Sequence, residues 1–269
     1  MIRNPVVAGQ FYSNSRALLL KEVKSYLGAG GAKEDAVGVV SPHAGYMYSG
    51  PVAGSVFSSI KPKDTYILLG PNHTGLGATF GLATYKTWKT PLGSVNLDSA
   101  LAKKITDNCP FIEEDDLSHS HEHSIEVQLP FIQAAQGAFE IVPICISHAE
   151  LGVYIEAGKA IAKSVSQLKR EKKVLIVASS DMTHYESVQE AKRKDTAAID
   201  AILRLDEKAL ARAVSELDIS MCGYAPTVMM LAAAKELGAT KAMLVRYQTS
   251  GDASGDYMSV VGYAGIIIS

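Results

Sequence analysis

Apolar runs of strand length recur along the chain, and within them hydrophobic residues are continuous rather than alternating. Continuous hydrophobicity is typical of strands that are covered on both faces. Stretches with helical periodicity separate these runs. The predicted strands are 37–41, 65–70, 78–85, 139–147, 173–179, 242–248 and 259–268. The predicted helices are 15–27, 50–60, 98–107, 154–170, 187–217 and 225–237. Because strands and helices alternate, we predict a helix–sheet–helix sandwich.

The stretch 187–217 is longer than one ordinary helix, and Asp206 is a suitable cap for a second helix within it. Residues 28–35 are predicted to form a loop before the first core strand. We find neither a domain linker nor an internal repeat, so we expect a single domain over residues 1–269.

Composition and charge narrow the classes of partner. The chain has 269 residues and a formal net charge of −2. This balance gives no electrostatic footprint for nucleic acid or for an anionic membrane surface. The expected partners are therefore small molecules, peptides or other proteins.

Two further features point to a cytoplasmic protein. The N-terminal stretch lacks the basic and apolar segments of a signal peptide, and no apolar run is long enough to span a membrane. The three cysteines are widely spaced and odd in number, which suits reduced thiols better than disulfides.

Potential ligands and acid–base groups follow several of the predicted strands. His43 and His73 each come after an apolar run and a proline, in "VGVVSPHAGY" and "TYILLGPNHTG". Asp181 and His184 follow "KVLIVAS", and Cys222 precedes a predicted helix whose N-terminus would favour a thiolate. In open α/β sheets, ligands bind beyond the carboxyl ends of the strands, so these side chains are candidates for one site.

Each of these residues also has an ordinary structural explanation. A single histidine after a strand is more often a hydrogen-bonded loop residue, a lone cysteine such as Cys222 is usually packed, and Asp181 could cap a helix. The recurrence of such groups after independent strands favours a functional site over these separate explanations.

A second histidine cluster occurs in "SHSHEHSIE". On a strand, its three alternate histidines would share one face and could bind a metal. The acidic run before it and the apolar run after it favour a loop that enters a helix. We therefore predict that His123 and Glu126 reach the site, while His119 and His121 are solvated.

Two histidines and an anionic third ligand are typical of non-heme Fe(II) sites. Asp181 and Cys222 compete for the third position, and a thiolate would shift the preference toward copper or zinc. His184 could act as an acid–base group, with Asp181 holding its tautomer. The expected cofactor is a divalent metal, with Fe(II) first and copper or zinc as alternatives.

Several ordered motifs resemble the Memo family, known in prokaryotes as AmmeMemoRadiSam system protein B. The resemblance runs from Arg3 to Gly265. It rests on "RNPVVAGQFYS", "SPHAGYMYSGPVAG", "LLGPNHTG", "TPLGSVNLD", "EHSIEVQLPF", "SSDMTHYE", "MCGYAPT", "RYQTSGDASGD" and "SVVGYAG".

This resemblance implies a three-layer α/β/α sandwich around a mixed β-sheet, similar to the LigB-like class III extradiol ring-cleaving dioxygenases. It implies that His43 and His73 are the metal histidines and that His184 is the acid–base histidine. Cys222 takes the place of the dioxygenases' glutamate ligand. Because a thiol replaces a hard carboxylate, the resemblance implies a metal pocket more firmly than ring cleavage.

Four hypotheses for function follow. The first is a dioxygenase-like redox enzyme that acts on a small aromatic molecule through His184, Asp181 and His123. The second is a non-catalytic module that binds a peptide or protein partner in the same cleft. The third is a metal-assisted hydrolase with His184 or Glu126 as base, and a nucleophilic Cys222 is a weaker fourth. The resemblance also implies association with a radical-SAM protein and an AMMECR1-like protein.

Overall fold

The computed structural model describes residues 1–28, 32–168 and 172–269. Its helices are α1 (Arg16–Leu27), α2 (Tyr46–Ser58), α3 (Ser99–Asn108), the 3-10 helix η1 (Glu126–Gln128), α4 (Leu129–Ala135), α5 (Leu151–Ser166), α6 (Val188–Leu203), α7 (Glu207–Glu216), α8 (Tyr224–Glu236) and α9 (Gly251–Ser254). Its strands are β1 (Ile2–Arg3), β2 (Gly38–Ser41), β3 (Thr65–Pro71), β4 (Phe80–Leu82), β5 (Thr87–Thr90), β6 (Gly93–Leu97), β7 (Glu113–Glu114), β8 (Glu140–Ile146), β9 (Val174–Ser179), β10 (His184–Glu186), β11 (Ala242–Thr249) and β12 (Val260–Ile268).

The strands form one mixed sheet in the order β1-β5-β6-β8-β3-β9-β2-β12-β10. Its centre consists of the four parallel strands β8, β3, β9 and β2. Beside β2, β12 runs antiparallel, and β11 pairs with β12, also antiparallel. The carboxyl ends of β2, β3 and β9 therefore lie next to one another at one edge of the sheet.

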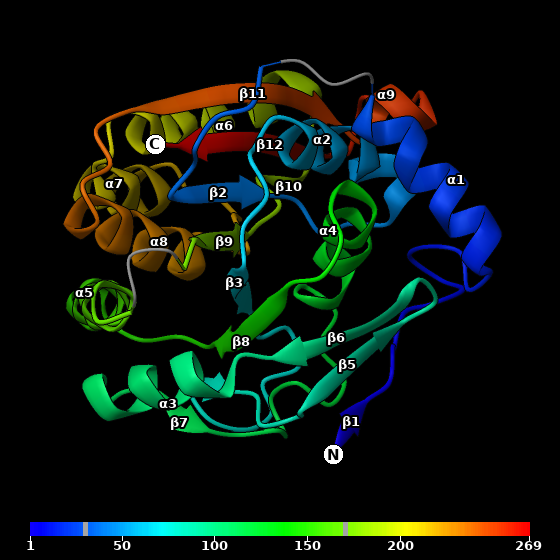
Figure 1. The fold of residues 1–269 in the computed structure, drawn as a ribbon. Helices are drawn as coiled ribbons and strands as arrows, with labels where there is room; N and C mark the ends of the chain where they lie inside the picture. The colour runs from blue at the N-terminus through cyan, green and yellow to red at the C-terminus, as the bar shows by residue number, and fades with distance from the viewer. Residues whose placement is uncertain (29–31, 169–171) are drawn as a thin grey trace.

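The central strands are buried on both faces, as their continuous hydrophobicity predicts. Along β3, Ile67 and Leu69 belong to one apolar cluster, whereas Tyr66 and Leu68 belong to a second cluster on the opposite face. Helices α3, α6 and α8 cover the first face, with α5 and α7 packed against them, and α1, α2 and α4 cover the second (Figure 1). The predicted three-layer α/β/α sandwich is confirmed.

Most predicted elements agree with the structure, with differences at their ends. The long stretch 187–217 divides into α6 and α7, and Asp206 caps α7 by accepting a hydrogen bond from the Ala209 amide at 2.8 Å. Helix α2 begins at Tyr46, four residues before the predicted start, directly after the His43 loop. Residues 29–31 and 169–171 lie outside the described residues, so the predicted loop 28–35 and the predicted helix end at Arg170 fall partly outside them.

The β5–β6 hairpin and the short strand β1 were not predicted, because these segments are short and contain many polar residues. Strand β1 pairs in parallel with β5, which brings Arg3 beside Trp88. Both side chains are buried. The first residues of the chain are thus part of the sheet.

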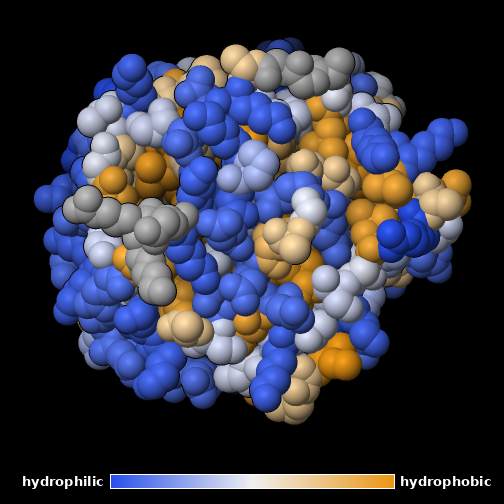
Figure 2. Space-filling model, in the orientation of Figure 1, coloured by the Kyte–Doolittle hydropathy of each residue, from blue (hydrophilic) through white to orange (hydrophobic). Residues whose placement is uncertain are grey.

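On the face seen in Figure 2, hydrophobic side chains occur in small, separate groups among hydrophilic ones. Among the helices of the described residues, none combines the length and the apolar character needed to cross a membrane.

Candidate metal centre

The candidate site residues come together at the carboxyl edge of the parallel strands. His43 follows β2, His73 follows β3 and Asp181 follows β9, each two residues after its strand ends. Cys222 lies two residues before α8. His184 is the first residue of strand β10, whereas the sequence suggested a turn or a first helical turn. Because β3, β9 and β2 are neighbours in the sheet, loops far apart in sequence meet here.

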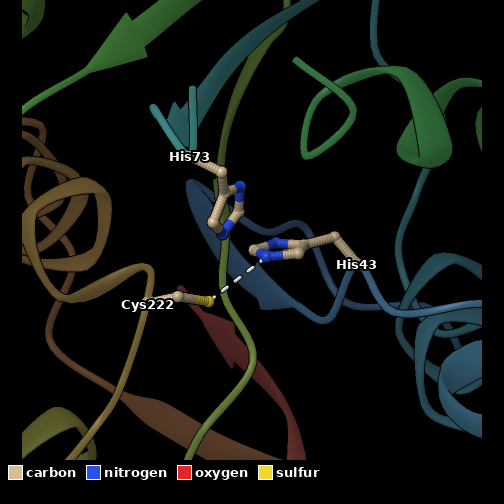
Figure 3. Close-up of side chains that lie close together, drawn as sticks. All are labelled: His43, His73 and Cys222. Atoms are coloured by element: carbon tan, nitrogen blue, oxygen red, sulfur yellow. Dashed lines mark hydrogen bonds between the residues drawn. The ribbon is translucent and has the colours of Figure 1, made fainter. Parts of the chain in front are cut away.

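His43, His73 and Cys222 form the centre of this cluster. The Nε2 atom of His43 lies 3.2 Å from the Cys222 sulfur, and the two imidazole rings are 5.2 Å apart between centroids. One ligand atom from each of the three side chains lies within 4.8 Å of the others. Figure 3 shows both rings and the sulfur pointing toward a common space between three separate chain segments.

The ring of His43 is held by Ser179. The Ser179 hydroxyl lies 2.9 Å from Nδ1 of His43 and donates its own hydrogen to the Ser124 carbonyl at 2.6 Å. Since that hydrogen is already used, Ser179 accepts from His43, and the ring proton belongs on Nδ1. The lone pair of Nε2 then faces Cys222. Burial, followed by the nearby His73, holds the pKa of His43 well below its usual value, so the ring is neutral.

The ring of His73 is held by a carboxylate that sequence reasoning did not select. Glu122 is buried, and its Oε1 atom lies 3.0 Å from Nδ1 of His73. Burial alone would raise the pKa of Glu122, but the hydrogen bond from His73 and the charge on that ring outweigh it, and the pKa falls to about 2. The same pair raises the pKa of His73 against the opposing effect of burial.

The sulfur of Cys222 is held by the peptide groups of Asp181. The Asp181 amide donates to the sulfur at 3.3 Å, and the thiol lies 3.6 Å from the Asp181 carbonyl. Burial and the negative charge of Asp181 raise the pKa of Cys222 well above its usual value. The predicted thiolate is therefore wrong for the metal-free site, in which the thiol is protonated.

The Asp181 side chain supports the His43 loop. Its Oδ1 atom accepts a hydrogen bond from the His43 amide at 2.8 Å, and burial raises its pKa to about 6 against the lowering effect of that hydrogen bond. Asp181 belongs to a neighbouring group with His184 and Cys222 rather than to the group formed by His43 and His73. Of the two candidate third ligands, Cys222 is the one that forms a group with both His43 and His73, with ligand atoms within 4.8 Å of one another.

His184 lies at the edge of this cluster. Its amide donates to the Ser220 hydroxyl at 2.8 Å, and its Nδ1 atom lies 2.9 Å from the Ser220 carbonyl. A carbonyl can only accept, so Nδ1 carries the proton and Nε2 is left with a lone pair. The backbone carbonyl of Ser220 therefore holds this tautomer, in place of the Asp181 side chain that was predicted to do so.

A cleft of about 620 Å³ opens onto these side chains. Its lining includes His43, His73, His123, Asp181 and His184. Four aromatic rings also line it, those of Phe11, Tyr48, Tyr185 and Tyr263. Tyr185 has a φ of 61° and is 78% exposed, an unusual backbone conformation for a bulky residue at the mouth of a cleft.

The second histidine cluster forms a loop, as predicted, but one of its three histidines is not where we expected it. His123 lines the cleft and His121 is exposed. His119 is buried rather than solvated, with its Nε2 atom 2.8 Å from the Gly81 carbonyl. Burial lowers the pKa of His119 to about 4. Because Gly81 belongs to β4, this hydrogen bond ties the loop to that strand.

Glu126 does not reach the cleft, so the prediction that it serves the site is wrong. Its carboxylate pairs with Arg3 at 2.8 Å and accepts from the Tyr12 hydroxyl at 2.6 Å. The amides of Val6 and Val7 donate to it as well. A carboxylate that is fully buried and bonded to four residues is a structural anchor and is not available as a base.

The donor set of His43, His73 and Cys222 fits a first-row transition metal. Each imidazole presents an Nε2 lone pair while its Nδ1 bonds to a protein acceptor, which is the usual arrangement of metal-ligating histidines. Imidazole and thiolate donors suit zinc, copper and iron. A metal at this position would displace the proton of the thiol, and metal binding would therefore release a proton.

A family model and several related proteins match this chain over nearly its full length. Residues 3–267 match the family model of the Memo-like proteins. The chain is 44% identical to a MEMO1 family protein of Methanosarcina acetivorans over 269 residues, covering 99% of both chains. It is 42% identical to a MEMO1 family protein of Methanopyrus kandleri over 281 residues, again covering 99% of both. A MEMO1 family protein of Pyrobaculum aerophilum is 44% identical over 279 residues, covering 99% of this chain and 98% of the relative.

Proposed function

Because the chain belongs to the Memo family, we propose that its cleft is a non-heme metal centre with dioxygenase-like redox activity toward a small aromatic molecule. His43, His73 and Cys222 would hold the metal. The observation that carries this proposal is the convergence of one ring nitrogen each from His43 and His73 and the sulfur of Cys222, all within 4.8 Å of one another. Fe(II) is the first candidate, and copper and zinc are alternatives because the donors suit all three metals.

A bound metal would supply Lewis acidity and, in the case of iron or copper, redox chemistry. The chain itself supplies the surroundings. His184 presents Nε2 as a proton acceptor, since its Nδ1 is bonded to the Ser220 carbonyl. In this proposal it takes a proton from a substrate hydroxyl. The aromatic rings of Phe11, Tyr48 and Tyr263 support an aromatic substrate by offering flat apolar surface beside polar groups.

Two other functions would use the same cleft. A binding module for a peptide or protein partner is favoured by one observation: Tyr185, which lines the cleft, is 78% exposed. A metal-assisted hydrolase would need zinc and a base, and only His184 is left for that role because Glu126 is bonded to Arg3.

Metal analysis of the purified protein tests the proposal. We expect near-stoichiometric metal in the wild type and its loss in the His43→Ala, His73→Ala double variant. The matched control is a His121→Ala, His148→Ala double variant, which removes two exposed histidines outside the cleft and should keep the metal.

Different metals separate the alternatives. Iron or copper, together with oxygen uptake in the presence of catechols, would support the redox enzyme. Zinc with hydrolysis that does not depend on oxygen would favour the hydrolase. Absence of metal in both proteins, with failed reconstitution by Fe(II), would overturn the metal centre and leave the binding module.

A further inference from the structure

We infer that Glu122 is a positioning residue of this centre: its carboxylate fixes His73 in the Nδ1–H tautomer and turns Nε2 toward Cys222. This inference rests on the proposed metal centre. It adds a residue whose effect on the metal position is exerted through His73.

Two hydrogen bonds link Glu122 to the same residue. Oε1 lies 3.0 Å from Nδ1 of His73, and Oε2 accepts from the His73 amide at 2.6 Å. The carboxylate therefore holds both the ring and the backbone of His73. Because an ionised carboxylate can only accept, Nδ1 must carry a proton, and in the neutral ring Nε2 then has the lone pair.

Glu122 is itself held rigidly. Its Oε1 atom also accepts from the amides of His123 and Ser124, both at 2.8 Å. The guanidinium of Arg3 donates to the Glu122 carbonyl. With 1% of its side chain exposed, Glu122 has little room to change rotamer, which is what a group that orients a ligand requires.

Glu122 could instead be read as a ligand of a second metal, together with His73 and His123, since these three also approach within 4.8 Å. The hydrogen bonds argue against that reading. Four N–H groups point at the two carboxylate oxygens, and a metal there would have to displace them. The orienting role uses every one of these contacts.

The two metal histidines differ in the partner that holds them. His73 bonds to a carboxylate, whereas His43 bonds to the neutral hydroxyl of Ser179. A carboxylate partner raises the basicity of a ligating imidazole. Glu122 should therefore strengthen the bond from His73 to the metal as well as direct it.

The first test uses the metal-free protein labelled with ¹⁵N in histidine. Long-range ¹H–¹⁵N correlation spectra report which ring nitrogen carries the proton. We expect the Nδ1–H form for His73 in the wild type, a mixed form in Glu122→Gln and recovery in Glu122→Asp. His43 should be unchanged in these variants, and Ser179→Ala should alter His43 instead.

The second test measures Zn(II) affinity by competition with a chromogenic chelator. Loss of an outer partner of a metal ligand typically costs about 10–100-fold in affinity, and we expect this loss in Glu122→Gln. Glu114→Gln, which changes an exposed carboxylate on β7, is the control and should bind as the wild type does. Unfolding curves of all variants show whether a weaker site reflects a less stable fold.

The outcomes separate the inference from the proposed function. An Nε2–H form of His73 in the wild type would overturn the inference without any variant. Unchanged affinity and an unchanged tautomer in Glu122→Gln would also overturn it and leave the metal centre in place. If the wild type binds neither Zn(II) nor Fe(II), the metal centre is lost, but the ¹⁵N spectra still decide whether Glu122 orients His73.

Discussion

Three histidines around the cleft have the same arrangement, although different partners create it. The Nδ1 atoms of His43, His73 and His184 bond to a hydroxyl, a carboxylate and a backbone carbonyl, respectively. In each case Nε2 is the ring nitrogen without a proton in the neutral imidazole. The shared arrangement indicates that the surroundings of the rings, and not only the rings, define the site.

The choice between Cys222 and Asp181 as third ligand can be tested with Co(II) as a spectroscopic probe. A thiolate ligand gives Co(II) an intense near-ultraviolet charge-transfer band. We expect the band in the wild type and in Asp181→Asn, and its loss in Cys222→Ser. Removing a direct ligand should also weaken binding by more than the roughly 10–100-fold that an outer partner contributes. A band that persists in Cys222→Ser but disappears in Asp181→Asn would reverse the assignment.

At the residue scale, the sequence predicted the groups that follow long apolar strands but missed Glu122 in the loop of the second histidine cluster. His43 and His73 could be selected because a strand and a proline precede each of them. Glu122 stands between two histidines after an acidic run, and it looks like one more solvated charge. Glu126 and His119 were misplaced because the sequence does not reveal that Arg3 and Gly81 lie beside them.

Helix α8, which begins two residues after Cys222, packs closely against α5. The pairing depends on Gly158 of α5, where a Cβ atom would lie 2.4 Å from the Met229 carbonyl oxygen and 2.9 Å from the Ala232 Cβ atom. The helices can approach this closely only if that position carries no side chain.

We therefore expect Gly158→Ala to lower the free energy of unfolding by about 1–3 kcal/mol, the usual cost of overpacking a core. Gly152→Ala is the matched control on the same helix, because nothing lies within 4 Å of its added Cβ atom. Its free energy of unfolding should be unchanged or slightly higher, since alanine favours helix. Urea unfolding of both variants makes the comparison, and equal stabilities would contradict the close contact.

At the element scale, long periodic segments were predictable and short polar ones were not. The division of 187–217 at Asp206 could be predicted because a capping side chain has a strong local signature. Strands β5 and β6 have few apolar residues and are stabilised by their neighbours in the sheet. Local sequence therefore contains little information about them.

On the scale of the whole molecule, Arg3 connects the start of the chain to the loop that carries Glu122 and His123. Its guanidinium pairs with Glu126, lies 4.1 Å from the centre of the Trp88 ring and donates to the carbonyl of His119. A buried charge of this kind is costly to leave unpaired.

We expect Arg3→Met to destabilise the protein by about 3–5 kcal/mol, because the carboxylate of Glu126 would remain buried without its cation. The Arg3→Met, Glu126→Gln double variant should lose less than the sum of the single changes. Glu156→Gln, which breaks the exposed pair with Lys159, is the control and should cost no more than about 1 kcal/mol. Thermal or urea unfolding is measured for the wild type, Arg3→Met, Glu126→Gln, the double variant and the control, and additive losses would show that Arg3 and Glu126 are not coupled.

The architecture as a whole was predictable because alternating strands and helices allow few arrangements. The order of the strands in the sheet was not predictable from local patterns. That order is what brings the loops after β2, β3 and β9 together, and so the site could be proposed as a set of residues but not as a geometry.

The contact between His43 and Cys222 determines at what stage of synthesis the proposed metal could bind. The two residues touch although 179 residues of chain separate them. At synthesis rates of 5–20 residues per second, Cys222 leaves the ribosome about 10–40 s after His43. A metal held by both can be loaded only after translation has passed Cys222 and α8 has docked. The choice of metal would then depend on which ions are available to the finished chain, and not on those present when His43 first emerges.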